Sequence, residues 1–234
     1  MMEKSSEIRR NVEAVQEQIG RAAAEAGRDP SEIRLMAVTK TQSAARVNEA
    51  IAAGVTLLGE NRAQELLEKY DGYDRAGCDI HFIGHLQSNK VRSIVDKVSM
   101  IESVDRLSLA QEISRCAQSH GLVMPVLIEV NIGREQSKSG VLPEALPELL
   151  EKISLLPGLS VRGLMAIPPN IEDTVQKEGY FEQMYRRFID MKAKKLDNVS
   201  MTILSMGMSH DYPLAIRHGS NVVRIGRALF GERM

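Results

Sequence analysis

The sequence predicts an α/β protein, a single (β/α)₈ TIM barrel with an extra N-terminal helix. Eight short apolar segments with strand character alternate with amphipathic helical segments along 234 residues. Such alternation is typical of a parallel sheet, and eight is the number of strands that closes this kind of barrel. An open doubly wound sheet is the alternative. It usually has fewer strands and a glycine-rich first loop, whereas the first loop here reads Thr39-Lys40-Thr41.

The first segment predicts a long helix that precedes the barrel. Its apolar residues recur at steps of four and three, which places them on one helical face. Gly27 and the pair Asp29-Pro30 end this helix. The apolar face comprises Ile8, Val12, Val15, Ile19, Ala22 and Ala26.

The strands and helices that follow are bounded by glycine, proline and polar residues. The predicted strands cover about 33–39, 55–59, 80–84, 99–102, 123–131, 161–167, 200–204 and 222–225. The predicted helices cover about 44–53, 61–70, 88–96, 107–117, 143–156, 181–191 and 212–218. The strand at 123–131 is almost continuously apolar, which indicates burial on both faces. No repeat and no low-complexity linker divides the chain, so residues 1–234 are interpreted as one barrel domain.

Composition narrows the function classes. The net charge is −1, which gives no electrostatic reason to expect a nucleic acid or a membrane surface as partner. No apolar run approaches the roughly 18 residues that span a bilayer, and the polar start is unlike a signal peptide. Cys78 and Cys116 form no C-x-x-C pair, which is typical of reduced thiols. We therefore expect a cytoplasmic protein.

Polar or functional residues follow the predicted strands at the point where each strand ends. A barrel brings all these ends to one rim, so residues distant in sequence gather around one pocket. Residues at or near this rim include Lys40, Glu60, Asn61, His85, Glu102, Asn131, Met165, Ser205, Met206, Ser209, Arg224, Ile225 and Gly226.

Lys40 follows the first predicted strand. Burial disfavours the charged form of a lysine, and only a neutral amine attacks an aldehyde. A lysine in such a pocket is therefore suited to Schiff-base formation with a carbonyl cofactor. The alternative is an ordinary solvated loop lysine.

Two segments near the end of the chain predict a phosphate site. Ser205-Met206-Gly207-Met208-Ser209 is expected to join a strand to a helix, where hydroxyl and free N–H groups can bind an anion. The segment Arg224-Ile225-Gly226 follows at the eighth strand, and barrels often bind phosphate at strands seven and eight. Ser209 and Asp211 can alternatively serve as plain helix caps.

Arg224 suggests how a bound ring would be controlled. A guanidinium does not give up its proton, so beside a pyridine nitrogen it donates a hydrogen bond and keeps that nitrogen unprotonated. Such a ring is a weak electron sink. A phosphate contact or a surface ion pair is the alternative role. His81 and His85 lie at a strand and its exit, where a spacing of four does not converge, so no metal site is expected.

Seven motifs together resemble the pyridoxal phosphate homeostasis proteins. They keep their order and spacing from about residue 5 to the end, and as a set they are highly specific. Asn221 is a departure, because the family more often has threonine there. The motifs are Ala37-Val38-Thr39-Lys40, Gly59-Glu60-Asn61-Arg62-Ala63-Gln64-Glu65, His81-Phe82-Ile83-Gly84-His85-Leu86-Gln87-Ser88-Asn89-Lys90, Ser137-Lys138-Ser139-Gly140, Gly163-Leu164-Met165, Leu204-Ser205-Met206-Gly207-Met208-Ser209 and Val223-Arg224-Ile225-Gly226.

The resemblance implies a barrel similar to the N-terminal domain of alanine racemase, with pyridoxal 5′-phosphate (PLP) as its cofactor. It implies that Lys40 carries PLP as a Schiff base and that Arg224 faces the ring nitrogen. Ser209 and the backbone at Ile225 and Gly226 would hold the phosphate, with Ser205 and Met206 beside it. Asn61, His85 and Met165 would line the pocket.

The resemblance also implies a function in PLP (vitamin B6) homeostasis without established catalytic turnover. PLP-dependent apoenzymes that receive the cofactor would then be partners. Alanine racemase adds a second domain that supplies a tyrosine, and this chain ends soon after the eighth strand, so a monomer without racemase activity is expected. The alternatives are a PLP-dependent amino-acid racemase, acting alone or with a partner, and an aldolase that uses Lys40 on a sugar phosphate.

Overall fold

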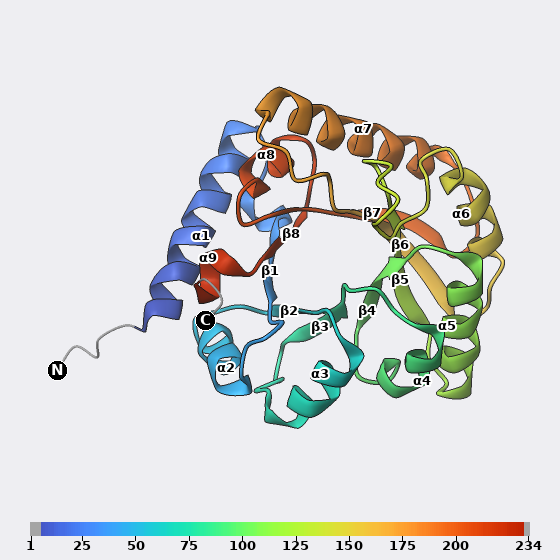
Figure 1. The fold of residues 1–234 in the computed structure, drawn as a ribbon, viewed down its shortest axis with the longest axis horizontal. Coiled ribbons are helices and arrows are strands. Elements are labelled where there is room, and N and C mark those ends of the chain that lie inside the picture. The colour runs from blue at the N-terminus through green and yellow to red at the C-terminus, as the bar shows by residue number, and fades with distance from the viewer. Residues whose placement is uncertain (1–5, 232–234) are drawn as a thin grey trace.

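Eight parallel strands close into a barrel, which confirms the predicted fold class. The structure is a computed structural model, and it describes residues 6–231. The strands neighbour one another in sequence order from β1 to β8, and β8 pairs with β1 to close the sheet. Figure 1 shows the helices arranged as a ring around this barrel.

The strand bounds agree with the predicted segments within a few residues, except at β7. In the first strand, Ala37 pairs with Leu58 on one side and with Ile225 on the other. The barrel is therefore closed by a regular parallel ladder between β8 and β1. The strands are β1 Arg34–Val38, β2 Leu57–Glu60, β3 Asp79–Phe82, β4 Met100–Val104, β5 Met124–Val130, β6 Leu159–Ala166, β7 Val199–Met208 and β8 Val222–Ile225.

The seventh strand corrects one prediction. We expected it to end at Leu204, with residues 205–209 as a loop, but β7 continues to Met208. The ladder between β7 and β8 changes register between Ser205 and Met208, and Gly207 lies there with a φ of +92°. A glycine inside a strand often marks such a bulge, because it adopts a positive φ at no steric cost. Ser205 and Met206 are therefore strand residues.

The helices pack on the outside of the barrel. Most begin close to the predicted start, but α4 and α6 begin three residues later than expected, with Pro147 in the first turn of α6, and α7 begins seven residues earlier. A short terminal helix, α9, was not predicted. The helices are α1 Glu7–Glu25, α2 Ala44–Ala52, α3 Ala63–Lys69, α4 Val91–Ile94, α5 Leu107–Ser119, α6 Leu146–Ser154, α7 Thr174–Ala193, α8 Tyr212–Arg217 and α9 Arg227–Phe230.

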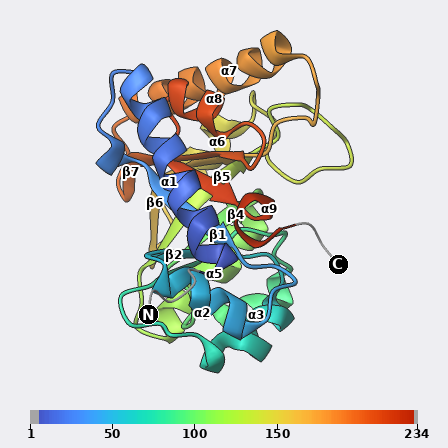
Figure 2. The ribbon, with the colours of Figure 1, turned by 90° about the vertical axis from the view of Figure 1, so that its left-hand side faces the viewer.

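The extra N-terminal helix lies across the outside of the place where β8 meets β1. Helix α1 packs against α2, α8 and α9, as Figures 1 and 2 show. Ser6 caps its start, and its buried face is the predicted apolar stripe, with Ala23 in place of Ala26. Helix α1 thus brings elements from both ends of the chain together.

Side-chain alternation along the strands divides the core into two parts. Successive strand residues point to opposite faces, so Ala37 and Leu58 pack under the helices while Met36 and Leu57 fill the barrel interior. The interior is apolar over its lower part. Its buried residues are Met36, Val38, Leu57, Ile83, Met100, Leu127, Met165 and Val222. Within residues 6–231, no helix is long and apolar enough to cross a membrane.

Candidate functional site

A polar network occupies the barrel interior toward the carboxyl ends of the strands. We call it the inner network, and it consists of His81, Glu102, Ser205 and Arg224. The Glu102 carboxylate accepts from His81 Nδ1 at 2.6 Å and from Ser205 Oγ at 2.6 Å. Arg224 donates from Nη1 to Ser205 Oγ at 2.8 Å and from Nη2 to the Ala166 carbonyl at 2.8 Å. Four strands thus fix one guanidinium.

The inner network keeps Glu102 ionised although it is fully buried. Burial by itself raises the pKa of this carboxyl, but the hydrogen bond and charge of His81, the charge of Arg224 and the Ser205 hydroxyl together outweigh it, so the pKa lies below its usual value. Burial lowers the pKa of Arg224, while Glu102 and Glu129 oppose that change. An arginine stays protonated under such conditions, so the inner network holds a fixed cation.

Glu129 of β5 is a second buried carboxyl in the interior, and sequence reasoning missed it. Burial and the charge of Asp105 raise its pKa to about 7, and Arg224 partly opposes this change. The available signal was a single acidic residue inside the apolar run 123–131. His81 was considered only as a metal ligand, whereas the structure makes it a partner of Glu102.

Lys40 lies in a tight turn directly after β1 and is half-buried. Met36 and Val38 face the interior, so strand alternation carries Lys40 to the same side. Gln42 N donates to the Thr39 carbonyl at 3.1 Å and closes the turn. Thr41 has a φ of +65° there, in the left-handed region that a threonine rarely adopts.

A second polar network lies on the other side of the barrel wall, between β2 and α3. We call it the outer network, and it consists of Thr39, Glu60, Glu65, Lys69 and Tyr73. Glu60 Oε1 accepts from the Thr39 hydroxyl at 2.6 Å and the Tyr73 hydroxyl at 2.5 Å. Lys69 Nζ lies 2.9 Å from Glu60 and 2.8 Å from Glu65. Burial and Glu60 raise the pKa of Tyr73, so its hydroxyl remains a donor.

Three predicted wall residues occupy different depths. Asn61 follows β2, and its side-chain oxygen is buried with no hydrogen-bond partner among the described residues. His85 is exposed at the rim after β3, where its Nδ1 lies 3.1 Å from Ser139 Oγ on the loop after β5. Met165 is fully buried beside Met100 in the apolar interior of the barrel.

The segments predicted to bind phosphate converge after β7 and β8. Ser209 Oγ accepts from the Ala228 amide at 3.4 Å, which joins the end of β7 to α9. Gly226 precedes that helix, and Ile225 ends β8 with its side chain in the outer core. Met206 likewise packs in the outer core, so only its backbone borders the interior. The structure brings Ser209 near Gly226, while Ser205 belongs to the inner network.

The residues present fit a pyridine ring with an aldehyde and a phosphate. A half-buried lysine follows β1, a fixed cation lies on the neighbouring strand β8, and Asn61 after β2, the other neighbour of β1, has unused hydrogen-bonding capacity. Among the described residues, no group of three or more histidine, cysteine, aspartate or glutamate side chains could hold a metal ion. An amine, a guanidinium and an amide are groups that can bind the aldehyde, the ring nitrogen and the phosphate of an organic ligand.

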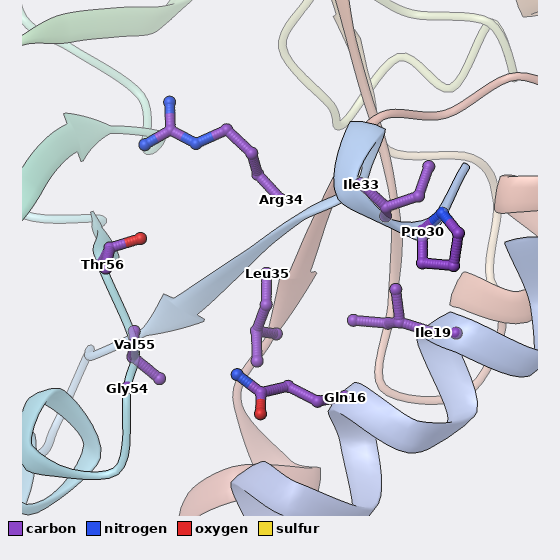
Figure 3. Close-up of a pocket in the computed structure, with 10 residues that line it drawn as sticks. Gln16, Ile19, Pro30, Ile33, Arg34, Leu35, Gly54, Val55 and Thr56 are labelled. Carbon is purple, nitrogen blue, oxygen red and sulfur yellow. The ribbon is translucent and has the colours of Figure 1, made fainter. Parts of the chain in front are cut away.

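A separate hollow of about 270 Å³ lies at the opposite end of the barrel. Figure 3 shows Gln16 and Ile19 of α1 facing Leu35, with Arg34 and Thr56 at the far side. These residues border the amino ends of β1 and β2, away from Lys40. The hollow has no contact with the inner or the outer network and is not part of the candidate site.

Comparisons with known proteins identify the family to which the chain belongs. Residues 6–234 match the model of the alanine racemase N-terminal domain. The pyridoxal phosphate homeostasis protein of Aquifex aeolicus is 43% identical, with 94% of this chain and 95% of the relative covered.

Two solved structures have a similar fold. PipY of Synechococcus elongatus, solved with PLP bound, is 33% identical with a TM-score of 0.80 and covers 92% of this chain and 100% of its own. Alanine racemase of Clostridium difficile has a TM-score of 0.67 at 17% identity, which shows the fold alone, and the match spans 56% of that protein. The chain belongs to the pyridoxal phosphate homeostasis protein family, whose barrel is of the alanine racemase N-terminal type.

Proposed function

We propose that this protein binds PLP at the carboxyl end of its barrel, holds it as a Schiff base on Lys40 and acts in intracellular PLP homeostasis. The relatives' shared name and the PLP-bound structure of PipY support the cofactor. The observation that carries the proposal is the pairing of a half-buried lysine at the end of β1 with a fixed arginine at the end of β8, because β1 and β8 are neighbours.

Lys40 supplies the covalent link. The neutral form of its amine would form a carbon–nitrogen double bond with the aldehyde of PLP, with release of water and without an oxidant or reductant. Reversal requires only water, which suits a protein that stores the cofactor and releases it to PLP-dependent apoenzymes.

The phosphate is assigned to the convergence of β7, β8 and α9. The Ser209 hydroxyl and the backbone amides at Ile225 and Gly226 would hold it, with Met206 and Ser205 behind them. Asn61 and His85 would form the side wall, and Met165 would support the floor. In this assignment Ser205 acts through Arg224, since its hydroxyl is already shared by Arg224 and Glu102.

Arg224 argues against catalytic turnover. PLP acts in catalysis by accepting electrons into its ring, most strongly when the ring nitrogen is protonated. A guanidinium fixed by Ser205 and Ala166 can donate a hydrogen bond to that nitrogen but supplies no proton. We therefore infer a carrier, with the whole chain acting as one barrel domain and as a cytoplasmic monomer. A PLP-dependent racemase is the alternative.

The decisive experiment compares Lys40→Ala with Lys138→Ala. Purified protein is incubated with PLP, reduced with borohydride and mapped by peptide mass spectrometry. We expect the label on Lys40 in the unchanged protein and in Lys138→Ala, and its loss in Lys40→Ala with the melting temperature preserved, because a rim residue contributes little to the core. A label on another lysine would refute the assignment.

A turnover assay separates carrier from racemase. The PLP-loaded protein is incubated with D- and L-alanine and with other amino acids, alone and with added lysate. We expect no racemisation above the rate of free PLP. Racemisation at ordinary enzymatic rates, about 1–10³ per second, would replace the carrier by the racemase.

A further inference from the structure

The turn that presents Lys40 has an unfavourable backbone. Lys40 and Thr41 are its two central residues, and the Gln42 amide closes it on the Thr39 carbonyl at 3.1 Å. Thr41 occupies the third position with a φ of +65°. Glycine or asparagine is favoured at a turn position with positive φ, and a β-branched residue is strained there. Such a conformation persists only where the surrounding structure fixes it.

Two side chains of α3 hold this turn on both sides of Lys40. Glu65 Oε1 accepts a hydrogen bond from the Thr41 amide at 2.5 Å, and this amide belongs to the peptide group that follows Lys40. Lys69 Nζ donates a hydrogen bond to the Thr39 carbonyl at 3.0 Å, and this carbonyl belongs to the peptide group that precedes Lys40. Glu65 and Lys69 also pair with each other at 2.8 Å, so the two contacts form one unit.

This pair differs from the ordinary surface pairs at the same spacing. The side chains of Lys69 and Glu65 are 11% and 19% exposed, and Lys69 has a second anionic partner in the fully buried Glu60. The pair of Lys152 and Glu148 on α6 has the same i,i+4 spacing but is 52% and 71% exposed. Exposed pairs of that kind contribute little, whereas hydrogen bonds to charged groups out of water are strong.

We propose that Glu65 and Lys69 are positioning residues for Lys40: they hold the strained turn that aims its amine into the barrel. This inference rests on the proposed role of Lys40, but its structural part concerns the turn alone. Without the pair, Thr41 would relax to a negative φ and the peptide planes flanking Lys40 would rotate. The amine would then sample many directions, and attack on an aldehyde would be slower.

The first test needs no cofactor. Amide hydrogen exchange is measured for Thr41 in the unchanged protein, in Lys69→Met and in Lys152→Met, with the melting temperature recorded for each. We expect Thr41 to exchange about tenfold faster or more in Lys69→Met, the factor for losing one hydrogen bond to a charged group, and no change in Lys152→Met. Equal exchange in all three proteins would overturn the proposal.

Glu65→Gln covers the case in which Lys69→Met does not fold. The amide has nearly the same shape, but it removes the charge and replaces one acceptor oxygen with an NH₂ donor. Faster exchange of the Thr41 amide supports the proposal, and an unchanged rate overturns it.

The second test measures Schiff-base formation with PLP. The yellow absorbance of the product is followed after mixing, and borohydride labelling identifies the lysine. We expect about tenfold slower formation in Lys69→Met than in Lys152→Met, with the label still on Lys40. An equal rate would overturn the positioning role. Absence of a label on Lys40 in the unchanged protein would instead refute the proposed function and leave the exchange result standing.

Discussion

The barrel wall separates two buried networks, each built around a glutamate that is fully inaccessible to solvent. In the inner network, Glu102 has bonded partners on both oxygens, and its companions come from β3, β7 and β8. In the outer network, Glu60 uses one oxygen for three donors, and its other oxygen has no hydrogen-bond partner among the described residues. The inner network is thus more fully satisfied.

The difference indicates that the two networks have different structural roles. The inner network joins strands far apart in sequence and fixes a cation in the barrel interior. The outer network is confined to residues 39–73 and holds the backbone around Lys40. A network that spans the barrel can fix a charge, whereas a local one can fix a turn. Disruption of the inner network should therefore cost more stability than disruption of the outer one.

Glu102→Gln should have the largest effect on stability. It leaves the buried Arg224 without its nearest anion, and breaking a buried charged network costs about 3–5 kcal/mol. The pKa of Glu102 is lowered by folding, so its stabilisation is present above the usual value of 4.5 and is lost as the pH falls through the lower folded value. Urea unfolding at pH 7 and pH 3 checks both points. An equal loss at the two pH values would contradict the charge argument.

Glu129→Gln should stabilise the protein by an amount that grows as the pH rises from about 4.5 to about 7. The folded pKa of Glu129 is about 7 against an ordinary 4.5, so the folded state binds more protons over this range and stability falls as the pH rises through it. The full penalty, present above pH 7, is about 3 kcal/mol. Unfolding free energies at pH 8 and pH 5 should show a clear gain for Glu129→Gln at pH 8 and a much smaller one at pH 5.

Tyr73→Phe should have the smallest effect. It removes one of three donors to Glu60 Oε1, and Thr39 and Lys69 remain. The expected loss is about 1–2 kcal/mol, measured by urea unfolding at pH 7. A loss as large as that of Glu102→Gln would mean that the outer network is as tightly coupled as the inner one, and the contrast between them would fail.

Much of the fold could be predicted because its signals are local. The apolar segments and their flanking breakers predict eight strands, and the stripe on α1 predicts its buried face. The end of β7 could not be predicted, because Gly207 resembles a loop glycine until the register of β8 is known. The pairing of Glu102 with Ser205 joins residues 103 positions apart, and no periodicity shows such a contact.

The candidate site was predictable in outline only. Strand ends predicted which residues meet at one rim, but not their depth. Met165 lies in the apolar interior, Met206 faces the helices and His85 is exposed. The outer network could not be predicted from the sequence, for a different reason. The spacing of Glu65 and Lys69 is that of an ordinary i,i+4 pair on a helix, and their contacts to Thr39 and Thr41 depend on how α3 packs against β2.

The position of α1 has a consequence for biosynthesis. The ribosome makes this helix before α8 and α9, against which it packs. Much of its apolar stripe therefore stays uncovered while the eight barrel strands and most of the helices are made, a period in which nascent chains are prone to aggregate. Helix α1 can complete its packing only after α8 and α9 have been synthesised.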